Sequence, residues 1–357
     1  MDELPAGLGV IEGFYGRVWS WEDRLLTQSF LGRHGYRFYV YAPKADATLR
    51  RHWREPWDAE TAGRIRELAA QARACGLLWG VGLSPLGLVE DFSREAIAAF
   101  RAKLAYLEGF EPDLLCLLFD DMPRGVEDLA ARQARLAVMA AELRHVRHLV
   151  VCPSYYSRDP VLERLFGAMP VGYWEDLGRD LPAQAAVFWT GERVCSTAYP
   201  EEDLRDMAGR LRRPVTLWDN YPVNDGARMS RFLHLAAFVD RPGRLSALTR
   251  AHFVNPMNQC RLSWLPLATL PLSYAAGAGY DPQRALATVA RELLGAEHAG
   301  LLCEDLDAFQ RLGLDAIGAG GRDRLLARYG EIAEPWAREI VAWLGGDYAF
   351  DPACLTD

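Results

Sequence analysis

Short runs of apolar residues recur along the chain, and segments with the three- to four-residue spacing of amphipathic helices separate them. The clearest run is Leu-Leu-Cys-Leu-Leu-Phe at 114–119, in which no polar residue interrupts the apolar ones. Unbroken runs of this kind are typical of strands that are buried on both faces, as in a parallel sheet.

The pattern as a whole predicts eight strands, which alternate with helices. The strands are expected to begin near residue 9 and to occupy 37–42, 77–83, 114–119, 148–152, 186–191, 215–219 and 252–255. The helices are expected from Ser20 onward and at 59–75, 93–107, 126–144, 160–167, 201–211 and 230–239, with Ser20 and Ser93 as N-caps. This alternation predicts an α/β fold, a (β/α)8 TIM barrel. A doubly wound open sheet is the alternative, but no glycine-rich phosphate loop follows the first strand.

The last part of the chain carries helical spacing without any strand pattern. Three helical segments are expected at 282–295, 298–312 and 322–345, with a flexible turn at 318–321. We therefore expect a catalytic barrel at 1–279 and a small C-terminal helical bundle at 280–357. Such a helical tail can also serve as a surface for a homodimer.

Composition excludes several classes of partner. Half of the residues are hydrophobic, so the chain can bury a sizeable core. The net charge of −8 and the sequence pI near 5.5 argue against nucleic acid or an anionic membrane as the main partner. Seven dispersed cysteines without a Cys-x-x-Cys pair indicate reduced core thiols. The first residues show no signal peptide and no apolar run reaches membrane-spanning length, so a cytoplasmic protein is expected.

The apolar run at 114–119 ends abruptly in two adjacent carboxylates, Asp120 and Asp121. Each disfavours ionisation of the other, and burial disfavours both charges. Such a pair can hold one charged and one protonated carboxyl, which general acid and base chemistry requires. Alternatively, one of them caps the following helix or pairs with a surface arginine.

Other polar and aromatic residues follow the remaining predicted strands. In a (β/α)8 barrel these positions meet at one end and form the active site. They are Gly13, Lys44, Tyr156, Trp189, Thr190, Trp218, Asn220, Asp225 and Asn255. Carboxylates, amides, a lysine and flat aromatic faces are suited to hold a polyhydroxylated ring. No metal-binding cluster or nucleophile elbow is visible, so the sequence indicates a carbohydrate-active enzyme that needs no metal or cofactor.

Seven short motifs together resemble glycoside hydrolase family 84, which comprises O-GlcNAcases and bacterial β-N-acetylglucosaminidases, including enzymes known as hyaluronidases. The motifs are Glu-Gly-Phe-Tyr-Gly at 12–16 with Trp19, Tyr-Ala-Pro-Lys at 41–44, Trp-Arg-Glu-Pro at 53–56, Phe-Asp-Asp at 119–121, Trp-Thr-Gly at 189–191, Trp-Asp-Asn at 218–220 and Val-Asn-Pro at 254–256. They run in order from about residue 9 to residue 256 and so span the whole predicted barrel.

The resemblance implies retaining, substrate-assisted hydrolysis of terminal β-linked N-acetylglucosamine. Asp120 would orient and polarise the 2-acetamido group of the substrate, which attacks the anomeric carbon and gives an oxazoline. Asp121 would protonate the leaving oxygen and then act as base toward water. Substrate-assisted enzymes are exceptions to the rule of two carboxylates on either side of the bond, and this explains how both acids can be neighbours.

The resemblance also implies roles for the binding residues. Tyr156 would donate to the acetamido oxygen, although the adjacent Tyr155 is a rival for that role. Asn220 would steady the same pocket, and Asp225 would bind the O4 and O6 hydroxyls. The remaining contacts would come from Lys44, Asn255 and the Gly13 backbone around O3, and from Trp189, Thr190 and Trp218 as walls of the acetamide pocket.

Two alternatives stay open at this point. A barrel that has lost turnover could bind N-acetylglucosamine as a sensor or lectin-like protein, although a pure binder has no need for two adjacent acids. The separate hexosaminidase family that pairs Asp with Glu fits less well, because no Asp-Glu pair ends a comparable strand. The natural aglycone is not indicated. Arg124, in the short loop after the fourth strand, is a candidate for the leaving-group side.

Overall fold

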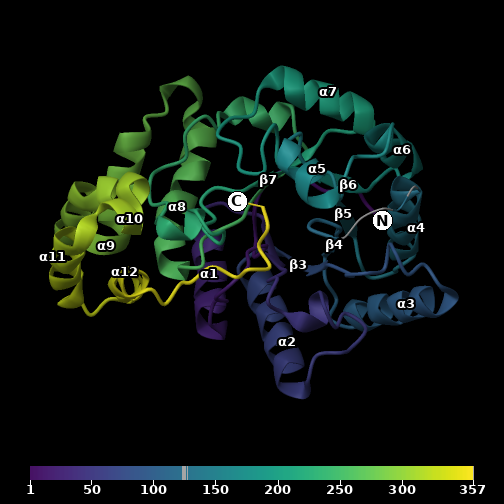
Figure 1. Cartoon of the computed structure of the whole chain (residues 1–357), viewed down its shortest axis with the longest axis horizontal. Helices are drawn as coiled ribbons and strands as arrows, with labels where there is room; N and C mark the ends of the chain where they lie inside the picture. The colour runs from purple at the N-terminus through teal and green to yellow at the C-terminus, as the bar shows by residue number, and fades with distance from the viewer. Residues whose placement is uncertain (123–125, 127, 357) are drawn as a thin grey trace.

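The computed structural model describes residues 1–122, 126 and 128–356, and its centre is a closed barrel of eight parallel strands (Figure 1). Each strand pairs with the next along the chain, and β1 pairs with β8. The predicted (β/α)8 barrel is therefore confirmed. The strands are β1 (Leu8–Ile11), β2 (Phe38–Tyr41), β3 (Leu78–Leu83), β4 (Leu114–Leu118), β5 (His148–Cys152), β6 (Ala186–Trp189), β7 (Thr216–Asp219) and β8 (His252–Val254).

Helices surround the barrel on its outer side (Figure 1). They are α1 (Trp21–Arg33), α2 (Ala59–Ala74), α3 (Arg94–Glu108), α4 (Leu129–Ala141), α5 (Pro160–Phe166), α6 (Tyr173–Asp180), α7 (Glu201–Leu211) and α8 (Cys260–Ala276), with a 3-10 turn η1 (Ala47–Leu49) after β2. Ser20 and Ser93 cap α1 and α3 as predicted, because each hydroxyl accepts a backbone N–H of the first turn.

The strand β4 is buried along its whole length, as its apolar run predicts. Close packing at this point depends on glycines in the neighbouring strand β3. A Cβ atom on Gly80 would lie 2.7 Å from Leu114 Cγ, and one on Gly82 would lie 2.5 Å from Ala42 Cβ. No larger residue fits there without a shift of the strands, so these glycines allow β4 to reach the mouth of the barrel in its observed register.

From residue 173 onward, one predicted helix of the barrel is wrong, and two observed helices, α6 and α8, were not predicted. The segment 230–239 is not a helix beyond the short 3-10 turn η2 (Met229–Arg231), and its buried Leu233 and Leu235 belong to a loop that packs on the barrel. The helix that completes the barrel is α8 instead, which the pattern did not indicate. It contains Pro266 and Pro271 and is apolar on nearly all sides, so it lacks the amphipathic spacing that marks a surface helix.

After the turn η4 (Gly277–Gly279), the chain continues as helices, as predicted. They are α9 (Pro282–Asp307), the π-helical η5 (Ala308–Leu312), α10 (Gly313–Ala316), α11 (Gly318–Gly330) and α12 (Pro335–Gly345). The residues 318–321 begin α11 and are not the flexible turn that we expected. The predicted domain boundary, between residues 279 and 280, falls at the end of η4.

The helix α12 docks on the barrel through one buried carboxylate. Glu339 accepts the backbone N–H groups of Arg261 and Leu262 at 3.0 and 2.9 Å, at the N-terminus of α8. That helix has no side-chain cap of its own, so Glu339 satisfies donors that would otherwise stay unpaired. Trp343 adds a hydrogen bond from its indole N–H to the carbonyl of Ser230 at 3.1 Å.

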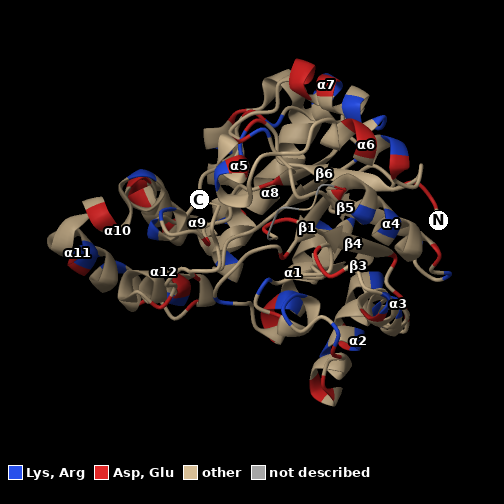
Figure 2. Ribbon diagram, turned by 45° about the vertical axis from the view of Figure 1, so that its right-hand side comes forward, with Lys and Arg blue, Asp and Glu red and all other residues tan. Residues whose placement is uncertain are grey.

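The charged residues lie mainly on the outer helices. Figure 2 shows both signs side by side on α3 and α7, whereas the strands are mostly uncharged. None of the described helices is both long and apolar enough to cross a membrane.

Glu339 makes the stability of this docking depend on pH. Burial raises the pKa of its carboxyl to about 7, because desolvation outweighs the two backbone hydrogen bonds. The folded protein therefore binds more protons than the unfolded chain between the ordinary carboxyl pKa and pH 7. It follows that Glu339 lowers the free energy of unfolding by about 3 kcal/mol as pH rises through this window.

We expect Glu339→Gln to flatten the dependence of Tm on pH between about pH 4.5 and 7, relative to the wild type. The measurement is a thermal melt at several pH values. The exposed Glu331→Gln is the control and should keep the wild-type slope. An unchanged slope in Glu339→Gln would show that this carboxyl does not titrate with folding.

Candidate active site

A cavity lies at the carboxyl ends of the strands, where the sequence predicts the active site. It is lined by Gly13, Tyr15, Lys44, Asp120, Asp121, Cys152, Tyr156, Thr190, Val194, Cys195, Trp218, Asn220, Val223, Asp225, Asn255, Cys354 and Thr356. Every predicted site residue except Trp189 is among them. Predicted site residues as distant in the chain as Gly13 and Asn255 thus share one cavity, as the (β/α)8 architecture requires.

Asp120 is the deeper of the two acids and is paired with a lysine. Its Oδ2 atom accepts the ammonium of Lys44, and both side chains are buried. Its Oδ1 atom has no hydrogen-bond partner among the described residues. A buried carboxylate oxygen without a partner is costly unless a donor arrives, so Asp120 offers an acceptor to a ligand.

Asp121 lies at the turn that ends the strand, with a left-handed φ of 52°. Two tyrosine hydroxyls donate to its carboxylate, Tyr15 to Oδ2 at 2.9 Å and Tyr156 to Oδ1 at 3.1 Å. Arg50 donates to its backbone carbonyl at 2.9 Å. Both carboxylate oxygens are held by donors, so the orientation of this acid is fixed.

The two acids differ in their readiness to hold a proton. Burial raises the pKa of Asp121, and the adjacent charge of Asp120 raises it further, while Lys44 and Arg50 oppose the shift only in part. Asp121 is therefore the member of the pair that is suited to act as an acid. Neither acid caps the next helix, because α4 begins at Leu129 with Asp128 as its N-cap.

Of the two adjacent tyrosines after β5, only Tyr156 faces the acids. The hydroxyl of Tyr155 instead donates to the carbonyls of Gly167 and Ala168 at 2.8 and 3.1 Å. Burial and the charge of Asp121 raise the pKa of Tyr156 well above its ordinary value. The hydroxyl therefore keeps its proton and remains a donor.

A chain of amides joins the ends of β1, β7 and β8. The backbone N–H of Gly13 donates to Asn255 Oδ1 at 3.1 Å, and Asn255 Nδ2 donates to Asn220 Oδ1 at 3.1 Å. The indole N–H of Trp218 reaches the same Asn220 oxygen at 2.9 Å. A Cβ atom on Gly13 would lie only 2.2 Å from Trp218 Cζ2, so glycine is needed for this close approach.

Trp189 is the predicted site residue that the structure places elsewhere. It is fully buried, its indole N–H donates to Asp203 Oδ2 at 3.3 Å, and its ring packs edge-on against Trp174. Successive residues of a strand point to opposite faces, so Thr190 faces the cavity and Trp189 faces the outer helices. Trp189 can therefore support the wall from behind but does not form it.

Sequence reasoning missed several residues of the cavity. Tyr15 lies within the motif at 12–16, and its backbone N–H donates to Asp225 Oδ2 at 2.7 Å. Its place in that motif could have identified Tyr15 as a site residue. Cys152 and Cys195 also line the cavity, and Arg50 donates to the backbone carbonyl of Asp121 without lining the cavity. No local sequence pattern distinguishes these three residues. Arg124, the candidate on the leaving-group side, lies outside the described residues.

The C-terminal segment enters the cavity from above. Figure 1 shows it in yellow, running from α12 across the mouth of the barrel, and Cys354 and Thr356 line the cavity. The free volume that remains is about 40 Å³. This is little more than one water molecule, whereas ligand sites usually measure ~300–1,000 Å³. With Cys354 and Thr356 in its lining, the cavity is therefore too small for a ligand of the usual size.

A larger hollow of about 970 Å³ lies between α1, the loop after β2 and α12. It contains neither of the acids, and it shares no lining residue with the cavity. Within the described part of the chain, no group of His, Cys, Asp or Glu side chains is arranged to hold a metal ion.

Comparisons with known proteins agree with the geometry. A family model described as beta-N-acetylglucosaminidase (NAGidase) matches residues 8–309. The Protein O-GlcNAcase of Mus musculus and that of Rattus norvegicus are each 26% identical over 276 residues, which cover 74% of this chain and 30% of theirs. This chain thus spans less than a third of the length of these relatives. The fold matches a mutant of the Thermobaculum terrenum O-GlcNAc hydrolase with a TM-score of 0.79 and 28% identity, covering 97% of this chain and 82% of that one.

Tyr15→Phe removes a donor that stabilises the charged form of Asp121, so the pKa of this acid should rise. If Asp121 works in its protonated form, the alkaline limb of kcat/KM should move up by roughly half a unit to one unit. The measurement is a pH profile with an aryl N-acetyl-β-glucosaminide. Tyr155→Phe is the matched control, since its hydroxyl faces other carbonyls. An alkaline limb that stays in place would disprove this link between Tyr15 and the acid.

Removal of residues 351–357 should open the cavity. A site that is free only part of the time binds with an affinity reduced by that fraction, so the shortened chain is expected to show a several-fold lower KM and an unchanged kcat. A synthetic peptide with the sequence of 350–356, added to the shortened chain, should compete with substrate. Equal KM values for both chains would show that the segment does not obstruct substrate.

Proposed function

Because the chain belongs to the β-N-acetylglucosaminidase family, glycoside hydrolase family 84, we propose that it removes terminal β-linked N-acetylglucosamine by retaining, substrate-assisted hydrolysis. The observation that carries the proposal is the unequal environment of two adjacent acids. Asp120 is paired with Lys44 and has one free acceptor, whereas Asp121 accepts two tyrosine hydroxyls and has a raised pKa.

In the first step, the unpartnered Oδ1 of Asp120 accepts the N–H of the 2-acetamido group. The acetamido oxygen attacks the anomeric carbon, and its bond forms as the bond to the aglycone oxygen breaks. Positive charge develops on the amide nitrogen as the oxazoline forms. A preorganised carboxylate beside that nitrogen stabilises this charge.

Asp121 supplies the proton that the departing aglycone oxygen needs. In the second step, the Asp121 carboxylate takes a proton from water while the water oxygen attacks the anomeric carbon and opens the oxazoline. The product retains the β configuration because two displacements follow one another. Tyr15 keeps the carboxyl aimed at the same point in both steps, which leaves the hydroxyl proton of Tyr156 for the acetamido oxygen of the substrate.

The remaining residues of the cavity fit the polar groups of the sugar. Tyr156 would donate to the acetamido oxygen and Asn220 would steady the same pocket, with Thr190 and Trp218 as its walls. Asp225 would accept the O4 and O6 hydroxyls. Lys44, Asn255 and the Gly13 backbone would surround O3. Trp189 has no direct role in this proposal, because it lies behind the wall.

The test is hydrolysis of aryl N-acetyl-β-glucosaminides by the wild type, Asp120→Asn and Asp121→Asn. Each substitution should lower kcat by about a hundredfold or more. The loss in Asp121→Asn should be smaller for a dinitrophenyl leaving group, which departs without a proton. The exposed Asp128→Asn is the control and should match the wild type.

N-fluoroacetyl substrates test the role of the acetamide separately. Each added fluorine makes the acyl oxygen a poorer nucleophile, so rates should fall progressively from acetyl to trifluoroacetyl. Equal rates across this series would rule out substrate assistance. Binding of N-acetylglucosamine in calorimetry without any turnover would favour the alternative of a sugar sensor or lectin-like protein.

Cleavage at a terminal sugar is compatible with several carriers of that sugar, namely protein serine or threonine, a bacterial glycan, a hyaluronan fragment and a disaccharide. Homodimerisation through the C-terminal helices and a cytoplasmic location also stay predictions.

A further inference from the structure

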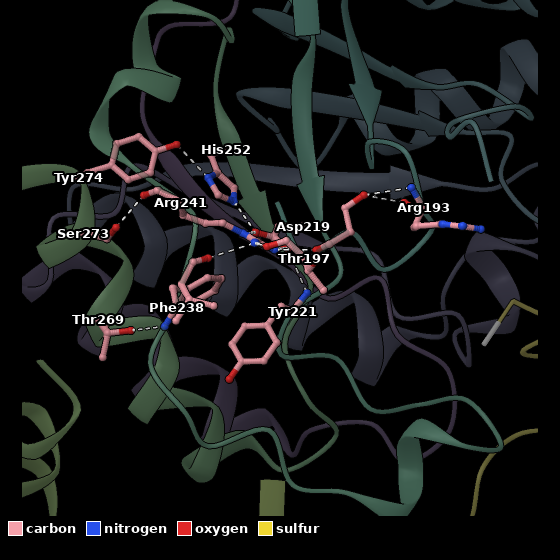
Figure 3. Close-up of polar contacts among 12 residues, drawn as sticks. Arg193, Thr197, Asp219, Tyr221, Phe238, Arg241, His252, Thr269, Ser273 and Tyr274 are labelled. Carbon is pink, nitrogen blue, oxygen red and sulfur yellow. Dashed lines mark hydrogen bonds and ion pairs between the residues drawn. The ribbon is translucent and has the colours of Figure 1, made fainter. Parts of the chain in front are cut away.

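Arg241 is a buried arginine that does not itself line the cavity, and Figure 3 shows its side chain reaching toward Asp219 and Thr197. It precedes the 3-10 turn η3 (Gly243–Ala247). Its guanidinium binds both carboxylate oxygens of Asp219 at the end of β7, with Nε to Oδ2 at 2.7 Å and Nη2 to Oδ1 at 2.9 Å. This bidentate contact fixes the plane of the guanidinium.

The same guanidinium also holds the loop that follows β6. Its Nη2 donates to the carbonyl of Ser196 at 2.8 Å, and its Nη1 donates to the carbonyl of Thr197. Figure 3 shows Arg241 reaching both Asp219 and this loop. One side chain therefore joins the end of β7 to the loop at 193–197.

The end of β7 and the loop at 193–197 both line the cavity. The loop contributes Val194 and Cys195, and the strand end contributes Trp218 and Asn220. Asn220 Nδ2 donates to the carbonyl of Val194 at 2.9 Å and is the second tie between loop and strand. These two ties hold the loop to the end of β7, and of the two side chains Asn220 lines the cavity whereas Arg241 does not.

The contacts of the Arg241 guanidinium with Asp219, Ser196 and Thr197 form a clamp between strand and loop. Neighbouring residues hold this clamp in place. Ser273 of α8 donates to the Arg241 carbonyl at 2.6 Å, and the preceding Asp240 has a left-handed φ of 54°. Asp219 also contacts His252 Nε2 at 3.0 Å and accepts the backbone N–H of Tyr221 at 3.2 Å. Burial opposes the charge of Asp219, but Arg241 and His252 hold its pKa well below the ordinary range. The ion pair thus persists wherever the protein is folded at neutral pH.

We propose that Arg241 is a positioning residue that sets the size of the N-acyl group accepted by the enzyme. The inference rests on the proposed function, in which this side of the cavity takes the 2-acetamido group. A planar guanidinium with five donors can serve a carboxylate and two carbonyls at fixed spacing. Lysine can neutralise Asp219 but cannot hold the two carbonyls at the same time. Without the clamp the loop can retreat, and a longer acyl chain then fits.

The experiment compares N-acetyl and N-propionyl β-glucosaminides in Arg241→Lys and the wild type. One added methylene is usually discriminated by about tenfold or more in a close-fitting pocket, and this is the ratio of kcat/KM expected for the wild type. In Arg241→Lys the ratio should fall to within about threefold, because kcat/KM should rise for the N-propionyl substrate and not only fall for the N-acetyl substrate.

Arg213→Lys is the matched control. Arg213 also binds several backbone carbonyls, those of Leu211, Pro182, Ala185 and Gly178, but none of these residues lines the cavity. Its replacement should lower Tm without a change in the acyl ratio. A similar loss of Tm and a wild-type ratio in Arg241→Lys would show that the arginine serves only stability, and would overturn the inference.

A second variant covers the case in which Arg241→Lys does not fold. Arg241→Met combined with Asp219→Asn leaves no unpaired buried charge and still removes the clamp, so the same fall in the ratio is expected. A wild-type ratio in this variant overturns the inference as well. Failure of the proposed function is distinguishable, because it appears as a wild type without turnover or without sensitivity to fluorination.

Discussion

Two carboxyl groups side by side at the end of a buried strand repel one another, and the mouth of the barrel is arranged around that repulsion. The two acids are given different partners. Lys44 neutralises Asp120 from β2, while Tyr15 and Tyr156 approach Asp121 from β1 and β5. Asp120 is thereby paired with a cation, whereas burial and the neighbouring charge of Asp120 raise the pKa of Asp121. The barrel makes this division possible, because it brings strand ends that are distant in sequence within hydrogen-bond reach of one another.

The fold could be predicted largely from local pattern. Buried parallel strands are unbroken apolar runs, and their alternation with amphipathic helices indicates a barrel. The failures have physical causes. The helix α8 is covered by the barrel and by α12 and α9, so it is apolar all round and contains two prolines. The loop at 230–239 has apolar residues because they pack inward, and their spacing resembled a helix by chance.

The site was predictable to the extent that it is made of strand ends. Side chains alternate between the two faces of a strand, so only one of two neighbours faces the cavity. The sequence alone does not show which of Trp189 and Thr190 does so. The choice between Tyr155 and Tyr156 depended on the backbone path after β5. Arg50, Arg241 and the C-terminal segment could not be found from sequence, since their contacts join residues tens to hundreds of positions apart without any local signature.

Tyr15 connects two carboxylates of the site, so a substitution at one of them also affects the other. Its backbone N–H binds Asp225, and its hydroxyl binds Asp121, so a single residue joins the carboxylate proposed for the far hydroxyls of the sugar to the one proposed for the proton. Under the proposed roles, this contact couples sugar recognition to proton delivery. A substitution at Asp225 would release the backbone N–H of Tyr15, whose hydroxyl binds Asp121. A change of sugar specificity at Asp225 would therefore also disturb the acid, unless a second change on the β1 side restored the position of Tyr15.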